Sequence, residues 1–267
     1  KDAGNLTTVV QPWHIELPAL RLERVALRYA DRGRAEPLLV QSAALRANGN
    51  LHLATGTPAR ADALSVRASR LEVGALDASA RAIVVNDAAV ERASLRGGTL
   101  ELGSIDLAGG SLRLTRMADG TTDLQRLFID HVRQARPAPA TPVARVAQQA
   151  WHVRSPDLRL RGFDLRVEDR TRAKPVRVEA AGTSAHMTFD FIAGQRFAVR
   201  DFHMQGGPLT LADESGARIT GLNSVRVAGG EIDSVSRRMA ADALVLRDGD
   251  LVMERDATGR LALLDTL

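Results

Sequence analysis

The feature that most constrains the fold is a stretch of the sequence that occurs twice. Residues 13–56 align without a gap to residues 151–194, at an offset of 151 − 13 = 138, with 17 of the 44 positions identical. The only two tryptophans, Trp13 and Trp151, occupy equivalent places, and each is followed by a histidine. A second pair, Leu107–Gly120 and Leu246–Gly259, matches at an offset of 249 − 110 = 139. An internal repeat of this length predicts two copies of one structural unit.

The repeat divides the chain into four expected segments. These are a lead-in at 1–12, a first β repeat unit at 13–128, a helix end and Pro/Ala-rich linker at 129–150, and a second β repeat unit at 151–267. Apolar residues at helical spacing predict a short helix within Thr122–Ala135, with Thr122 or Asp123 as its N-cap. The prolines of Arg136–Pro142 (RPAPATP) exclude a helix interior or central strand, so this segment is expected to be an exposed linker.

Both copies show the alternation of apolar and polar residues that is typical of half-buried strands. In the first copy Leu20 and Leu22 alternate with charged residues, and Val25, Leu27 and Tyr29 continue the pattern after a change of phase at Glu23-Arg24. Such a slip is expected at a tight turn or a bulge. Short strands are expected to follow at Leu38–Ala47, Leu51–Ala54, Leu64–Ala68, Leu71–Val73, Ile83–Val85 and Val90–Leu95.

A second sequence pattern places Gly-Gly or Asp-Gly between two short apolar runs. Such dipeptides are favoured where both turn residues need positive φ, so each occurrence predicts a tight hairpin. No dinucleotide-binding or P-loop context surrounds these glycines, which argues against a phosphate site. The five occurrences are Leu95–Leu100, Leu107–Leu112, Met204–Leu209, Val227–Ile232 and Leu246–Leu251.

Composition and motifs argue against several classes of protein. The chain has no cysteine, and its 36 basic residues are interspersed with 32 acidic ones, giving a net charge of +4 without the basic blocks and aromatic platforms of nucleic-acid binders. No nucleophile elbow, HExxH motif or other compact ligand spacing is present. The repeated His14 and His152 are better explained by strand packing than by two metal sites, and Asp31 and Asp169 by capping of a turn. We therefore expect neither an enzyme, nor a cofactor or metal, nor a nucleic-acid partner.

The expected strands are apolar on one face, and one predicted helix is too little to cover them. The sheet must therefore either curl into a closed core or leave a concave apolar surface, and an open surface of that size usually has a ligand or partner. The sequence leaves both possibilities open. In the second case eight residues are expected to line the concavity: Leu20, Leu22, Val25, Leu27, Leu158, Leu160, Phe163 and Leu165.

Two motifs carry a resemblance to a known family. The run W-H-x-x-x-P-x-L-x-L leads into a strand that ends at Asp31 or Asp169, and G-x-L-x-x-x-R-x-x-x-G closes each copy at Gly110–Gly120 and Gly249–Gly259. Both resemble the AsmA-like proteins of Gram-negative envelopes, in particular the large members with tandem domains of unknown function. The resemblance covers both units, but its motifs are short and mostly structural.

The resemblance implies a mainly β fold, a tandem antiparallel repeating β-groove or curled elongated sheet with one short helix at the unit junction. It also implies a periplasmic protein, held in the inner membrane by an N-terminal anchor that this sequence lacks. Such a groove would bind acyl chains of phospholipid or another lipid and contribute to lipid transport between membranes and to outer-membrane assembly. The alternatives are a structural β array with a closed core and a scaffold that binds an envelope protein partner by edge-strand addition.

Overall fold

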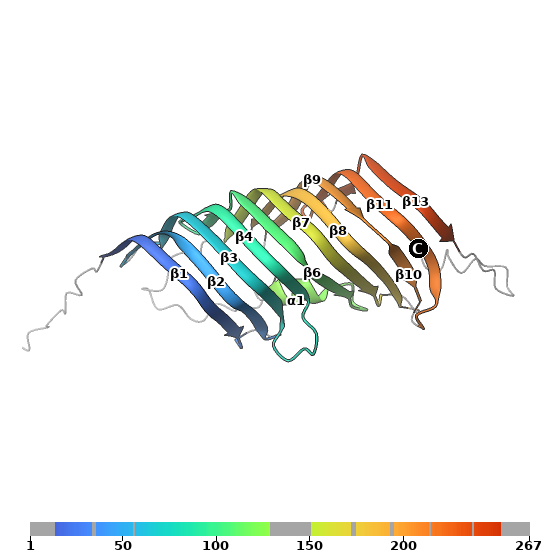
Figure 1. The fold of residues 1–267 in the computed structure, drawn as a ribbon, viewed down its shortest axis with the longest axis horizontal. Coiled ribbons are helices and arrows are strands. Elements are labelled where there is room, and N and C mark those ends of the chain that lie inside the picture. Colours follow the sequence, from blue (N-terminus) through green and yellow to red (C-terminus); the bar gives the residue numbers. More distant parts are fainter. Residues whose placement is uncertain are drawn as a thin grey trace, which may run out of the picture.

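The computed structural model describes residues 14–128 and 151–251, except 34–35, 56, 172–174, 193–194, 214 and 237. The predicted lead-in 1–12 and linker 129–150, including Arg136–Pro142, lie outside the described residues. Within them the chain is mainly β, as predicted, and forms one mixed sheet of 13 strands. Figure 1 shows this sheet as a long trough, with β1 at one end and β13 at the other.

The elements follow one another along the trough in almost the order of the sequence. The first six strands are β1 (His14–Asp31), β2 (Leu38–Ala54), β3 (Arg60–Ala75), β4 (Ile83–Arg96), β5 (Thr99–Glu101) and β6 (Ser104–Arg116). A short helix, α1 (Asp123–Phe128), follows them. The remaining strands are β7 (His152–Asp169), β8 (Val176–Ile192), β9 (Arg196–Gly206), β10 (Leu209–Ala212), β11 (Arg218–Asp233), β12 (Arg238–Ala240) and β13 (Ala243–Leu251).

The strand bounds recur at the spacing of the sequence repeat. Strands β7 and β8 begin and end 138 residues after β1 and β2, since 152 − 14 and 176 − 38 both equal 138. Strands β12 and β13 begin 139 residues after β5 and β6, since 238 − 99 and 243 − 104 both equal 139. The sheet nevertheless runs without a break from one copy to the next, because β6 hydrogen-bonds to β7. The division into two domains stays a prediction.

The sheet is not purely antiparallel, which corrects the predicted topology. Strands β5 and β6 both pair with β7 in parallel, whereas all other pairings are antiparallel. The reason is the number of strand positions in the first copy. It has five, because β5 and β6 occupy one position beside β4, so the fifth runs in the same direction as the first. A second copy that starts in the direction of the first must then pair in parallel, which requires a long return connection.

The strands are longer than predicted. The breaks in the alternating sequence pattern, which predict the ends of strands, are bulges inside continuous strands. The expected short segments between Leu38 and Leu95 merge into β2, β3 and β4. The phase slip at Glu23-Arg24 is a register shift inside β1, with Arg24 at φ 51°, and the equivalent slip in β7 has Gly162 at φ 66°. A bulge bends its strand and increases the local twist. Successive bulges of this kind help to curve the sheet into the trough seen in Figure 1.

Four of the five predicted hairpins are wrong for the same reason. Only Leu95–Leu100 turns the chain, where Gly97 and Gly98 join β4 to β5. The turn residues expected in the others lie inside β6, at the end of β9 and directly after it, inside β11 and inside β13. A residue at positive φ serves a bulge as well as a turn, so the dipeptide alone does not distinguish the two.

Helix α1 lies beneath the arch, on the concave side of the sheet (Figure 1). Leu127 is 1% exposed and packs with Leu38, Val73 and Ala82, while Leu124 packs against the edge of the same cluster. The helix therefore covers part of one wall of the trough, over β2, β3 and the start of β4. The remainder of the predicted helix, residues 129–135, lies outside the described residues.

Candidate functional site

The concave side of the trough carries an unbroken row of apolar side chains. Cross-strand pairing joins ten residues into one line from β1 to β13, which we call the central row. Its members are Val25, Leu45, Ala68, Ala88, Leu107, Leu160, Ala185, Met204, Val227 and Leu244. Directly paired residues of neighbouring strands lie on the same face of a sheet, so all ten share one surface.

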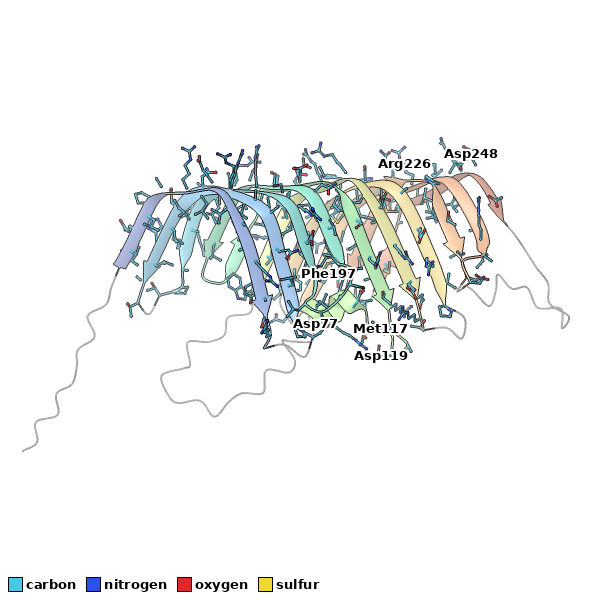
Figure 2. All side chains as sticks on the ribbon, turned by 60° about the horizontal axis from the view of Figure 1, so that its bottom comes forward. Asp77, Met117, Asp119, Phe197, Arg226 and Asp248 are labelled. Carbon is cyan, nitrogen blue, oxygen red and sulfur yellow. The ribbon has the colours of Figure 1, made fainter. Side chains whose placement is uncertain are left out.

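The direction of the central row follows from its neighbours. Arg226 points away from the trough in Figure 2, on the convex side. Val227 follows Arg226 on β11 and therefore points to the opposite, concave face. Val227 pairs with Met204, which belongs to the central row. The central row thus lines the interior, which we call the inner face.

A second row runs beside the central row and passes under α1. It contains Tyr29, Val40, Val73, Ile83, Leu112, Leu165, Ala180, Leu209 and Leu222. Val40, Val73 and Ile83 belong to the cluster that α1 covers, so this row also lies on the inner face. The parallel pairing of Leu112 with Leu165 carries the row from the first copy into the second without a step.

In the second copy the inner face contains a cluster of aliphatic, aromatic and sulfur-containing side chains. Met187, Val199 and Ala185 are buried and pack with Leu158, Leu160 and the ring of Phe202. Phe189 and Phe197 pack against the same cluster, and their ring centroids lie 5.8 Å apart in an edge-to-face arrangement. Among the described residues no helix covers this wall, so the partly buried side chains here shield one another.

The structure places the eight predicted lining residues on β1 and β7, and their exposure separates them into two groups. On β7, Phe163 is 3% exposed, and Leu158, Leu160 and Leu165 are half-buried. On β1, Val25 is 43% and Leu27 is 39% exposed, while Leu20 and Leu22 are half-buried. The difference arises because β7 has a strand on either side and β1 pairs only with β2 among the described strands. Whether these residues bind a ligand stays a prediction.

The lining residues expected from the sequence make up only a small part of the inner face. The clearest repeat covers only β1 and β7, so the expected set does not contain Leu107, Met204, Val227 or the phenylalanines of β8 and β9. The alternation within these strands contains the signal. Each bulge shifts the alternation by one residue, so the sequence alone does not show which residues of different strands share a face. The pairing register between the strands shows it.

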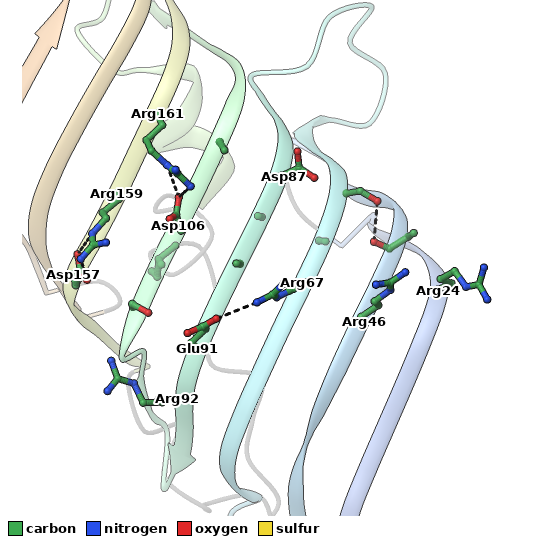
Figure 3. Close-up of a pocket in the computed structure, with 18 residues that line it drawn as sticks. Arg24, Arg46, Arg67, Asp87, Glu91, Arg92, Asp106, Asp157, Arg159 and Arg161 are labelled. Carbon is green, nitrogen blue, oxygen red and sulfur yellow. Dashed lines mark hydrogen bonds and ion pairs between the residues drawn. The ribbon is translucent and has the colours of Figure 1, made fainter.

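The convex side has a separate hollow of about 730 Å³, shown in Figure 3, with a charged lining. Arg161 donates to Asp106 (2.7 Å), Arg159 to Asp157 (2.7 Å) and Arg67 to Glu91 (3.3 Å). These pairs are exposed, and such pairs contribute little to stability. Six arginines and four acids line the hollow, and its apolar lining is limited to alanines and one isoleucine. We therefore interpret it as a solvated outer surface and not as the main binding surface.

Carboxylates at the ends of the strands are held in their ionised form. A backbone hydrogen bond from Ser236 and a side-chain hydrogen bond from Arg196, with a further backbone bond from Val235, lower the pKa of Asp233 to about 2. Hydrogen bonds from Arg96 and Arg60 also lower the pKa of Asp62. These groups fix turns and strand ends at the rims of the trough. A general acid would instead need a raised pKa.

Of the two repeated histidines, His152 has a half-buried side chain (29% exposed), whereas the side chain of His14 is 61% exposed, so the predicted strand packing is not seen for His14. His14 lies 3.0 Å from Glu16, and His152 lies 2.9 Å from Asp190. Asp31 and Asp169 each accept a backbone N–H from two residues further on, at 3.0 and 2.9 Å, which confirms the predicted turn capping. Within the described part of the chain no group of three or more His, Cys, Asp or Glu side chains could hold a metal ion.

The described helix is also too short and too polar to cross a membrane. Comparison with known proteins adds no assignment: no protein-family model matches this chain, and no curated protein matches it.

Proposed function

We propose that the inner face binds the acyl chains of lipids and that the trough is a segment along which lipid moves between membranes. The observation that carries the proposal is the central row, ten apolar residues in line on a concave surface over which the described residues place one short helix. Soluble proteins rarely leave apolar surface of this extent uncovered without a ligand or partner.

The dimensions of the sheet are consistent with this ligand. The strand order has ten positions, so nine spacings of about 4.8 Å give a trough roughly 43 Å long. One acyl chain spans about half of the ~30 Å hydrocarbon core of a bilayer. The trough could therefore hold at least two chains end to end. Each buried methylene contributes about 0.8 kcal/mol, and movement along a continuous row requires no chemical step.

The rims offer positions for a lipid headgroup. One rim carries Arg116 beside Asp169 and Arg170 beside Glu168, and the Nε of Arg177 is buried without a hydrogen-bond partner among the described residues. Guanidinium groups bind phosphate through paired N–H donors. We propose that headgroups stay at this wet rim while the chains lie on the inner face.

The resemblance to AsmA-like proteins supports the same proposal. On this basis we propose a periplasmic location, an inner-membrane anchor outside this sequence, and a role in phospholipid transport and outer-membrane assembly. The exposed edge strands favour a second candidate, a non-catalytic scaffold that binds an envelope protein by strand addition. Lipid extraction from the purified protein followed by mass spectrometry distinguishes the two, because only the first predicts bound phospholipid.

Leu27→Arg tests the proposed lipid surface with little risk to the fold. Leu27 is already 39% exposed on the inner face, so the guanidinium can reach water while it intrudes on the acyl chains. Because burial of an unpaired charge costs several kcal/mol, we expect a fluorescent fatty-acid probe to bind more than about tenfold more weakly near this position. Leu165→Arg, at the equivalent place on β7, should also lower binding and co-purified phospholipid.

The matched control is Ala26→Arg, which places the same charge on the neighbouring, exposed, convex-facing position. This variant should bind the probe like the wild type. Equal loss in both variants, or no lipid and no probe binding in the wild type, would contradict lipid binding on the inner face.

A further inference from the structure

Of the strands that the structure describes, the two at the ends of the sheet each have one unpaired edge. Among the described strands, β1 pairs only with β2, and β13 pairs only with β11. The unpaired edge of β1 belongs to a strand of 18 residues, whereas proteins usually shorten, charge or cover an exposed edge. Figure 1 shows the two edges at opposite ends of the trough.

Exposed apolar residues concentrate at these edges. The large hydrophobic residues that are exposed among the described ones lie on β1, β12 and β13, apart from Trp151 and Val235. They are Ile15, Leu17, Val25, Leu27, Tyr29, Met239, Leu244, Val245 and Leu246. The equivalent of Val25 on β7 is Phe163, since 25 + 138 = 163, and its exposure falls from 43% to 3% where a neighbouring strand is present on both sides.

The parallel strand pairing at the centre of the sheet indicates how its two edges could pair with each other. In its centre β6 pairs in parallel with β7, and β13 and β1 are the counterparts of these two strands. The pair Leu107–Leu160 transfers to Leu246 opposite Leu22, since 107 + 139 = 246 and 160 − 138 = 22. The inner face would then continue from one molecule into the next without a change of register.

Two further transferred pairs bring opposite charges together. Ala108–Arg161 becomes Arg247 opposite Glu23. Gly109 and Gly162, the bulge residues at φ 62° and 66° that lie between the pairs Ala108–Arg161 and Gly110–Phe163, become Asp248 and Arg24, both at φ 51°. Arg24, Arg247 and Asp248 make no ion pair with another described residue, whereas Glu23 pairs with Arg21 on its own strand. The bulges therefore match across the proposed junction, and the charges there are complementary.

We propose that β13 of one copy of this chain pairs in parallel with β1 of a second copy, in the register of β6 and β7. The contact is head-to-tail and does not close on itself, so repeated pairing produces linear oligomers. Each junction would bury the apolar edge residues and lengthen the trough. The proposal concerns self-association and stands whether or not lipid binds to the inner face.

Cysteine cross-linking tests the register directly, because the chain has no cysteine of its own. Glu23→Cys and Arg247→Cys are exposed, single-thiol variants of the full chain. When the two are mixed under mild oxidation, we expect a mixed disulfide dimer that neither variant forms alone. Arg28→Cys mixed with Arg247→Cys is the control, since Arg28 lies five residues, or about 16 Å, from the predicted partner, and it should not cross-link.

Charge reversal tests the complementarity by sedimentation over a range of protein concentrations. Glu23→Arg and Arg247→Glu should each weaken self-association about tenfold, because like charges then face each other across the junction. The double variant should restore it. The proposal would be overturned if the wild type stays monomeric and the mixed cysteine variants form no disulfide dimer. Rapid cross-linking of Glu23→Cys alone would also overturn it, because it would show β1 pairing with β1. Circular dichroism confirms that each variant is folded.

Discussion

Phe163→Ala is expected to lower the free energy of unfolding by about 3–5 kcal/mol, the usual cost of removing a buried aromatic side chain. Phe163 is 3% exposed in the middle of the sheet, between Gly110 on β6 and Thr183 on β8. Gly110 has no side chain, so nothing on β6 could fill the space that the lost ring leaves. Urea unfolding followed by circular dichroism measures the change.

The internal control is Val25→Ala at the equivalent position of β1. Val25 is 43% exposed and has a described strand on one side only, so the loss should be below about 1 kcal/mol. Similar losses for the two variants would contradict the exposure difference between the edge and the centre of the sheet.

Gly110→Ala is expected to destabilise the protein by more than about 3 kcal/mol. Gly110 has φ 144°, and a Cβ at this position would lie 2.0 Å from the carbonyl oxygen of Val84 on β4. This neighbour is backbone and cannot rotate away, so β4 and β6 would have to separate. The same unfolding measurement applies, with loss of the β signal at ambient temperature as the extreme outcome.

Gly120→Ala separates this clash from the general cost of a left-handed backbone. Gly120 has φ 80°, and a Cβ there would meet nothing within 4 Å. The free energy of unfolding of Gly120→Ala should therefore fall only by the roughly 1–2 kcal/mol that a left-handed backbone costs a residue with a side chain. Equal losses at Gly110 and Gly120 would show that close packing of β4 against β6 is not what requires glycine.

The sequence predicted the class of fold because alternation of apolar and polar residues is a local property. The strands around Leu20–Tyr29 and their copy around Leu158–Val167 follow from period two and the repeat alone. Hairpins could not be distinguished from bulges, since Gly109 inside β6 and Gly97 in a turn both adopt positive φ. The difference depends on whether the partner strand continues past the residue, which is a non-local fact.

The sequence pattern also could not predict the parallel pairing of β6 with β7. It depends on β5 and β6 sharing one strand position, which sets an odd number of positions before β7. The sequence predicted that one face of the sheet is apolar, but not how many strands contribute to it. Leu160 was among its expected members, whereas Met204 and Val227 join it only through pairing across several bulged strands.

The central claim is that lipid chains lie on the inner face, and two neighbouring residues test it most directly. Met204 belongs to the central row, and Gln205 pairs with Arg226 on the convex face. A photo-reactive amino acid at each position in turn, irradiated with the purified protein and phospholipid vesicles, reports which face contacts acyl chains by mass spectrometry of the adducts. The account predicts lipid adducts at position 204 and few at 205. Adducts at 205 that equal or exceed those at 204, or none at either position, would contradict it.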